Sequence, residues 1–219
     1  MTSLPFRGLI FDLDGTLADS LADIGEAMNL TLRAHGLAEH PIADYSRMVG
    51  EGIEKLVRRA LPADCPLPFP AMVDEYRANY KALDHRHTQI YPGIEALLEA
   101  LTAAGVPMAV LSNKRDDFTR DLVTKRLGRF PFKAVRGEQA GVPRKPDPTA
   151  ALELALALNV APARIGFVGD TPIDMNTAKN AGMTGVGVLW GFRTRQELVE
   201  AGAKHLIATP AELLSLKVS

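Results

Sequence analysis

The sequence predicts an α/β fold in which a doubly wound parallel sheet carries a helical insert after its first strand. Short apolar runs bounded by turn residues alternate with segments of helical periodicity over most of the 219 residues. This alternation is typical of a parallel sheet covered by helices. The exception is residues 17–88, which show helical patterns but no convincing strand. We therefore expect a sheet domain made of residues 1–16 and 89–219, and a helical domain made of residues 17–88.

Five apolar runs are the predicted strands of the sheet. Three of them have the length and composition of buried parallel strands. These three are "GLIF" before Asp12, "PMAVL" before Ser112 and "IGFV" before Gly169. Two weaker runs are "KAVRG" around Val135 and "TGVGVL" around Val186.

Apolar residues at helical spacing account for the segments between the strands. Positions i, i+3, i+4 and i+7 of such a segment share one helix face, which can pack on the sheet or on another helix. Gly105 marks the end of the first helix of the sheet domain, as glycine commonly does. The helical segments lie around residues 94–101, 118–123 and 149–158 of the sheet domain, and around residues 21–32, 53–61 and 70–84 of the insert.

Composition and charge exclude several classes of function. The net charge is −1 and the acidic and basic residues are interspersed, which leaves no electrostatic footprint for nucleic acid or an anionic membrane. No apolar run approaches the roughly 18 residues of a membrane span. The single cysteine, Cys65, excludes an intrachain disulfide, and the first residues do not resemble a signal peptide. We expect a cytoplasmic monomer or homodimer with no nucleic-acid or membrane partner.

Polar residues gather where the predicted strands end. In an open parallel sheet, ligands bind outside the carboxyl ends of the strands, so these residues should meet at one edge. They are Asp12 and Asp14 after the first strand, Ser112 and Asn113 after the second, Asp170 and Asp174 after the third, and Lys145 in a nearby loop. The predicted site therefore combines several carboxylates with a hydroxyl group and an ammonium group.

This set of side chains predicts a magnesium site that receives a phosphoryl group. Carboxylates held close together need a cation, and ligands that are all oxygen favour Mg²⁺. A calcium-binding loop does not fit "DLDGTLADSLAD", because its glycine stands at the fourth position rather than the sixth. Mg²⁺ bound by few carboxylates completes its shell with water and substrate phosphate. Ser112, Lys145 and a helix N-terminus could bind the remaining phosphate oxygens.

The two aspartates after the first strand suggest a division of labour. Asp12 could attack phosphorus and form an acyl phosphate, while Asp14 could protonate the leaving oxygen and then activate water. Alternate residues of an extended chain share one face, so both carboxylates can reach one substrate. Taken alone, Asp12 and Asp14 could be only a turn, and Asp174 only an acid in the first turn of a helix.

Four motifs resemble, in order and approximate spacing, the signature motifs of the haloacid dehalogenase-like hydrolases. They are "DLDGT", "LSNK", "RKPDP" and "GDTPIDM", and the resemblance spans almost the whole chain. It implies a Rossmann-like core with a small α-helical cap inserted after the first strand. It also implies these roles: Asp12 as nucleophile, Asp14 as acid and base, Ser112, Asn113 and Lys145 as phosphate ligands, and Asp12, the Asp14 carbonyl, Asp170 and (through water) Asp174 as Mg²⁺ ligands.

Within that family, the sequence is most similar to the phosphoglycolate phosphatases. The similar stretches are "DGTLADS", "MVGEGIEKLVRRAL" and "YPGI". The resemblance implies hydrolysis of a small phosphomonoester, with 2-phosphoglycolate as the expected substrate. Gly50 and Gly52 would let the cap backbone approach the substrate, and Arg47 or Lys55 could face its carboxylate. Arg58 is a further candidate for that contact.

Other functions remain as alternatives at this point. They are a phosphatase for a sugar phosphate or pyrophosphate, and a phosphomutase similar to β-phosphoglucomutase. A non-catalytic module that binds a phosphorylated ligand would not need both Asp12 and Asp14. Structural roles are expected for several other residues: Asp19 and Ser20 as helix caps, His85 and His87 at a hinge or surface, and Trp190 and Phe192 in the core.

Overall fold

The computed structural model describes residues 4–216. Within this range, six parallel strands form one sheet in the order β5-β4-β1-β6-β7-β8. Their bounds are β1 Gly8–Phe11, β4 Met108–Arg115, β5 Phe132–Glu138, β6 Ile165–Gly169, β7 Thr184–Val188 and β8 His205–Ile207. β1 is the first strand in the sequence and lies in the middle of the sheet, so the later strands lie on both sides of it. The fold is the predicted doubly wound α/β fold.

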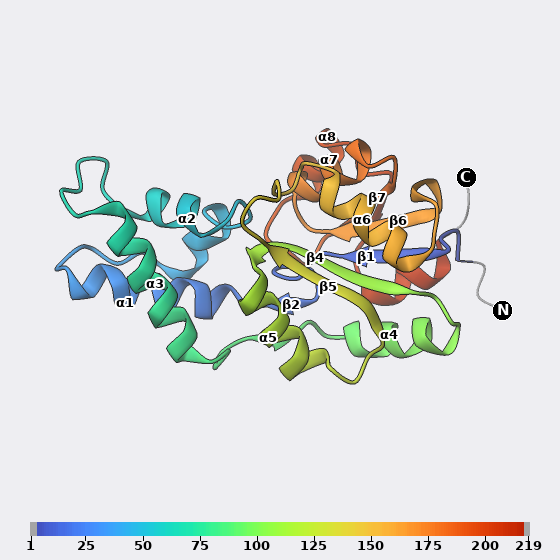
Figure 1. Cartoon of the computed structure of the whole chain (residues 1–219), viewed down its shortest axis with the longest axis horizontal. Coiled ribbons are helices and arrows are strands. Elements are labelled where there is room, and N and C mark those ends of the chain that lie inside the picture. The colour runs from blue at the N-terminus through green and yellow to red at the C-terminus, as the bar shows by residue number, and fades with distance from the viewer. Residues whose placement is uncertain (1–3, 217–219) are drawn as a thin grey trace.

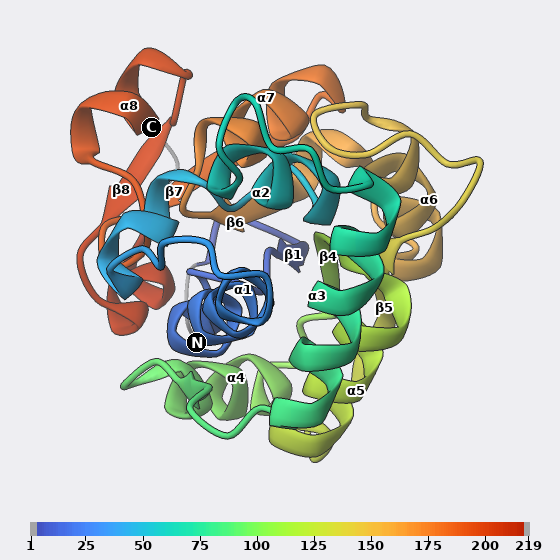
Figure 2. The ribbon, with the colours of Figure 1, turned by 90° about the vertical axis from the view of Figure 1, so that its left-hand side faces the viewer.

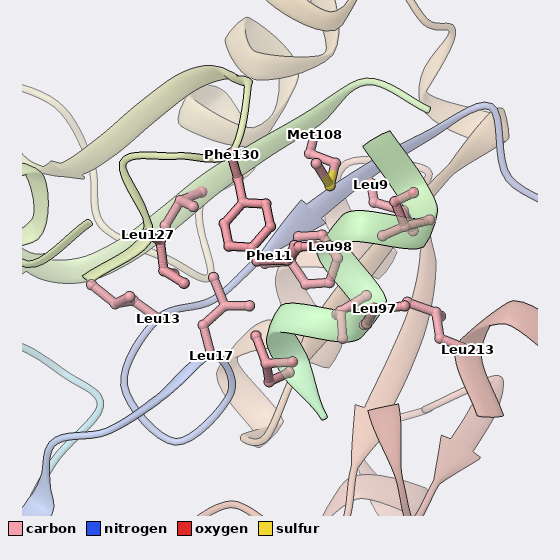
Figure 3. Packing of buried hydrophobic residues seen from close by; sticks show 14 of the residues in the cluster. Leu9, Phe11, Leu13, Leu17, Leu97, Leu98, Met108, Leu127, Phe130 and Leu213 are labelled. Carbon is pink, nitrogen blue, oxygen red and sulfur yellow. The ribbon is translucent and has the colours of Figure 1, made fainter. Parts of the chain in front are cut away.

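Helices cover both faces of this sheet. Their bounds are α4 Ile94–Ala103, α5 Asp116–Leu127, α6 Thr149–Leu158, α7 Pro172–Asn180 and α8 Arg195–Glu200, with 3₁₀ helices η2 Pro162–Arg164 and η3 Pro210–Ser215. Leu9 and Phe11 of β1 pack with residues of α4 and α5, whereas Ile10 packs with residues of α6 and α7. Figure 2 shows the helices on the two sides of the sheet, and Figure 3 shows α4 against the Leu9 and Phe11 side chains of β1. Because both faces of β1 are buried, its sequence is continuously apolar.

The helical insert has a hydrophobic core of its own. It contains α1 Leu21–Ala34, η1 Ile42–Arg47, α2 Ile53–Ala60 and α3 Phe69–Leu83, grouped at one end of the molecule (Figure 1). Met28, Tyr45 and Tyr76 are among the residues that fill its core. None of the helices in residues 4–216 has both the length and the apolar character needed to cross a lipid bilayer.

The structure adds three strands that the sequence did not predict. β2 Ala18–Asp19 and β3 Gln89–Ile90 form an antiparallel pair where the chain leaves and re-enters the sheet region. β2 therefore lies within residues 17–88, where no strand was expected. β8 has only the residues "HLI". Elements of two or three residues are too short to show a hydrophobic period, which is why the sequence did not reveal them.

The predicted positions of two site residues are also corrected. Ser112 and Asn113 lie inside β4 rather than after it, because β4 continues to Arg115. The pairing with β5 changes register between Leu111 and Arg115. Ser112 and Asn113 lie within this irregular stretch, and bulges are common next to functional sites.

Candidate active site

Three buried carboxylates meet at the carboxyl edge of the sheet. Oxygens of Asp12, Asp170 and Asp174 all lie within 4.8 Å of one another. The backbone N–H of Asp12 donates to the carbonyl of Val168 at 2.9 Å, which continues the pairing of β1 with β6 and places Asp12 beside Asp170. Asp174 comes from the first turn of α7. The sheet topology therefore assembles the predicted acidic cluster from residues far apart in sequence.

Lys145 lies within this cluster. Its ammonium is 2.9 Å from Asp12 Oδ1 and 2.7 Å from Asp174 Oδ1, and the residue is buried. Burial alone would lower the pKa of Lys145, but the two carboxylates outweigh burial and raise it. The Asn113 side chain fixes the backbone here, because Oδ1 accepts from the Lys145 N–H at 2.9 Å and Nδ2 donates to the Lys145 carbonyl at 3.1 Å.

The cluster carries more negative than positive charge. Its three carboxylates face a single ammonium group, so their full ionisation leaves two negative charges in excess. Burial, followed by repulsion from Asp174, raises the pKa of Asp12 well above its usual value and that of Asp170 to about 7. One divalent cation would make the charges balance. The donors are all oxygens, so the residues fit a hard ion such as Mg²⁺.

Hydrogen bonds orient the other two members of the cluster. Asp170 Oδ1 accepts from the Thr16 hydroxyl at 3.0 Å, and Oδ2 accepts from the Phe192 N–H at 2.8 Å. Asp174 Oδ2 accepts from the hydroxyl and the N–H of Thr171 at 2.7 and 3.1 Å, which forms a capping box at the start of α7. Asp174 therefore lies in the first turn of α7, where an acidic residue can serve the helix alone. It also contacts Lys145 in the acidic cluster.

Asp14 lies apart from the cluster and has its own cation. Its Oδ1 accepts from the Ser20 hydroxyl at 2.5 Å, and the Lys114 ammonium lies 2.9 and 3.1 Å from the two carboxylate oxygens. Ser20 occupies the N-cap position of α1 as expected, but its side chain makes no capping hydrogen bond. Gly15 follows at φ +86°, and a Cβ there would lie 2.3 Å from Asp170 Oδ2. Only glycine fits this position.

A pocket opens beside these residues, between the sheet and the insert. Asp12, Asp14, Ser112, Asn113 and Lys114 line it from the sheet side. The insert contributes a largely apolar wall made of Ile24, Val49, Ile53, Leu56, Tyr76 and Tyr80. The structure therefore brings both candidate catalytic aspartates and the predicted residues of β4 to one cavity.

Gly50 and Gly52 also line this pocket, as expected of them. Both have positive φ, +108° and +93°. A Cβ on Gly52 would lie 2.6 Å from a guanidinium nitrogen of Arg144. The Gly50 carbonyl accepts from Asn113 Nδ2 at 2.9 Å. Glycine is therefore favoured at both positions by the backbone conformation, and a Cβ at position 52 would also require the Arg144 guanidinium to shift.

The three candidate cations of the insert do not line the pocket. Arg47 ends η1 with an exposed side chain, and Lys55 is exposed on α2 and pairs with Glu51. Neither residue is among those that line the pocket. Arg58 is exposed and lies over the ring of Phe69. The cation that sequence reasoning missed is Lys114, the last residue of "LSNK", whose signal was its place directly after Ser112 and Asn113.

The structure also places the aromatic residues and histidines that were expected to have structural roles. Phe192 packs against the core of the insert and also lines the pocket, and Trp190 packs against the main core as expected. His85 is buried and pairs with Asp121 at 2.9 Å, and His87 pairs with Glu26 at 2.8 Å. His85 therefore joins the insert to α5, whereas the pair formed by His87 lies within the insert.

Comparison with known proteins agrees with this geometry. Residues 9–188 match the family model of the haloacid dehalogenase-like hydrolases. The chain is 30% identical over 218 residues to a phosphoglycolate phosphatase of Nitrosospira multiformis (97% of this chain and 96% of that protein). It is 36% identical over 205 residues to one of Rhodospirillum rubrum (90% and 85%). A crystal structure described as a predicted phosphoglycolate phosphatase from Haemophilus somnus superimposes with a TM-score of 0.89 at 26% identity, covering 96% of this chain and 97% of that one. The chain belongs to the haloacid dehalogenase-like hydrolases.

Proposed function

We propose that the protein is a Mg²⁺-dependent phosphatase that hydrolyses a small phosphomonoester, 2-phosphoglycolate, through a phosphoenzyme on Asp12. The observation that carries the proposal is the buried cluster of Asp12, Asp170 and Asp174, which could hold a cation and whose member Asp12 also lines the pocket. The substrate follows from the relatives, since phosphoglycolate phosphatases match at 30% identity or more over most of both chains.

Mg²⁺ would be held by Asp12, Asp170 and the backbone carbonyl of Asp14, with Asp174 reaching it through water. When bound, it supplies positive charge for the carboxylates and the phosphoryl group. Lys145, Ser112 and the backbone of Asn113 bind the phosphoryl oxygens in this proposal. The contact of Lys145 with Asp12 supports that role, because the ammonium already lies beside the attacking group.

The reaction has two displacements. An Asp12 oxygen attacks phosphorus, the bond to the bridging oxygen breaks, and Asp14 gives its proton to the alkoxide that leaves. Water then attacks the acyl phosphate while Asp14 takes its proton, so phosphate leaves and Asp12 is regenerated. The position of Asp14 supports this division, since it lines the same pocket as Asp12 but lies outside the acidic cluster.

The remaining assignments are also proposals. We propose residues 17–88 as a cap over a core made of residues 1–16 and 89–219, supported by the pocket that both parts line. A cytoplasmic location is supported by the presence of only one cysteine, Cys65. The oligomeric state, monomer or homodimer, stays a prediction.

A phosphate-release assay tests the proposed function. Purified protein with Mg²⁺ should release phosphate from 2-phosphoglycolate with a higher kcat/KM than from a hexose phosphate or pyrophosphate. EDTA should abolish release, and added Mg²⁺ should restore it. Release that continues in EDTA would contradict the metal proposal. An isomerised hexose phosphate without free phosphate would favour the phosphomutase alternative instead.

Mg²⁺ should stabilise the protein more at about pH 8 than at about pH 5.5. The folded protein without Mg²⁺ holds Asp170 with a pKa of about 7, against an ordinary value of 3.8. Because the pKa of Asp170 is higher in the folded protein than its ordinary value, the protonated carboxyl stabilises the folded state at low pH. This stabilisation is fully present below the ordinary pKa of 3.8 and is lost as pH rises through about 7. Mg²⁺ replaces the proton as the balancing positive charge. The Tm difference between Mg²⁺ and EDTA samples, measured by scanning fluorimetry, should therefore widen with pH, and a constant difference would contradict the assignment of Asp170 as a ligand.

A further inference from the structure

Lys114 occupies a position between the sheet and the insert. It lies near the end of β4, its side chain is only 6% exposed, and its ammonium contacts both carboxylate oxygens of Asp14. On the insert side, the ammonium lies 4.6 Å from the ring centre of Tyr80. Among the described residues that line the pocket, Lys114 is the one that carries a positive charge.

The other nearby cations are already engaged. Lys145 lies between Asp12 and Asp174 and does not line the pocket. Arg144 pairs with Glu54 and Glu138. Lys114 is also paired, with Asp14, but it is the one described cation that lines the pocket, so an anionic group on the leaving part of a substrate would meet it there.

Tyr80 supplies a second observation. Its hydroxyl is buried beside the Lys114 ammonium and makes no hydrogen bond of ordinary geometry among residues 4–216. A buried hydroxyl without a partner costs free energy, so such groups in folded proteins usually await a ligand or water. Because Tyr80 lines the same pocket as Lys114, one acceptor could take hydrogen bonds from both side chains.

We infer that Lys114, with the Tyr80 hydroxyl, binds the carboxylate of the substrate and so selects phosphate esters of 2-hydroxycarboxylic acids. This inference rests on the proposed function and adds the residues that read the leaving group. In 2-phosphoglycolate a single methylene separates the carboxylate from the bridging oxygen. Asp14 must contact that oxygen to protonate it, and Lys114 contacts Asp14. A cation in this position is close enough to bind a carboxylate that is one carbon away.

The walls of the pocket strengthen this recognition. Ile24, Ile53, Leu56 and Phe118 surround the polar groups with apolar surface. A charged hydrogen bond in such surroundings is stronger than one exposed to water. The same walls disfavour a sugar, whose hydroxyl groups would be buried without partners. Lys114 therefore provides selectivity for a short acidic leaving group rather than general affinity.

The test compares two substrates that differ only in the carboxylate. Ethyl phosphate has the same primary alkoxide as 2-phosphoglycolate but no acidic group. In Lys114→Met, the ratio of kcat/KM for 2-phosphoglycolate to that for ethyl phosphate should fall about 10- to 100-fold, the usual effect of losing a hydrogen bond to a charged group. Lys114→Arg should restore part of the ratio, and Tyr80→Phe should lower it severalfold. Lys81→Met, an exposed lysine next to Tyr80, is the matched control and should keep the wild-type ratio.

Each alternative has its own result. If Lys114 only positions Asp14, Lys114→Met slows both substrates equally and the ratio stays constant, which overturns the inference. If Lys114→Met does not fold, as judged by circular dichroism, Tyr80→Phe decides through the same ratio, because it removes only an unpaired hydroxyl. If the wild-type protein hydrolyses other phosphomonoesters but does not prefer 2-phosphoglycolate to ethyl phosphate, the proposed substrate is wrong and the inference is wrong with it.

Discussion

Replacing Asp12 with asparagine should lower kcat by about 10⁴-fold or more, because the amide cannot form the acyl phosphate. The other catalytic residues cannot compensate, since the effects of residues that act as a unit are lost together. The fold should persist. Burial raises the pKa of Asp12, so its charge costs stability in the absence of a cation, and a neutral amide removes that cost. The measurement is phosphate release at saturating 2-phosphoglycolate, together with the Tm in EDTA.

A matched variant separates this effect from a general loss of charge. Asp44 is an exposed aspartate of η1, outside the pocket, and Asp44→Asn should retain wild-type kcat. Mass spectrometry after acid quenching should show an added phosphoryl group on wild-type protein and none on Asp12→Asn. Substantial turnover by Asp12→Asn, or a phosphoryl group on another residue, would contradict the nucleophile assignment.

Replacing Asp14 with asparagine should have an effect that depends on the leaving group. General acid catalysis is typically worth about 10²- to 10⁴-fold, so kcat/KM for 2-phosphoglycolate should fall by that factor. With 4-nitrophenyl phosphate the loss in the first displacement should be much smaller, because nitrophenolate leaves without a proton. The second displacement still needs a base. Stopped-flow measurements should therefore show a stoichiometric burst of nitrophenolate, followed by slow turnover.

The control for this prediction is Asp19→Asn, because Asp19 is an exposed aspartate close to Asp14 in sequence. It should show neither the leaving-group dependence nor the burst. An equal loss with both substrates in Asp14→Asn would mean that Asp14 acts by holding Lys114 or the backbone, and the acid–base assignment would be wrong.

The sequence predicts the fold and the polar edge of the sheet well, because both depend on local signals. The run "GLIF" is apolar throughout, so it predicts a strand buried on both faces. Asp12 and Asp170 follow two such strands, and neighbouring parallel strands must bring them together. Side-chain partners are different. Nothing near Ser20 in the sequence indicates that it donates to Asp14 instead of capping α1.

The charged residue that lines the pocket was also hard to predict from the sequence, because it too depends on side-chain partners. Arg47 and Lys55 have the right charge for a substrate carboxylate, but which way a helical side chain faces depends on how the insert packs. Lys55 instead lies where it can pair with Glu51. Lys114 has the same charge and lies in a motif, but only the fold places it between Asp14 and Tyr80. The charge of a side chain can be read from the sequence, whereas the direction in which the side chain points depends on the tertiary structure.

The fit of Gly15 against Asp170 has a consequence for how this site can change. A methyl group at position 15 would overlap the Asp170 carboxylate, so the space for that carboxylate is created by the missing side chain of a distant residue. An alanine at position 15 would force the Asp170 carboxylate to move even if every charge were kept. Residues 15 and 170 are therefore sterically coupled. A substitution at one of them, in evolution or in the laboratory, requires a compensating substitution at the other.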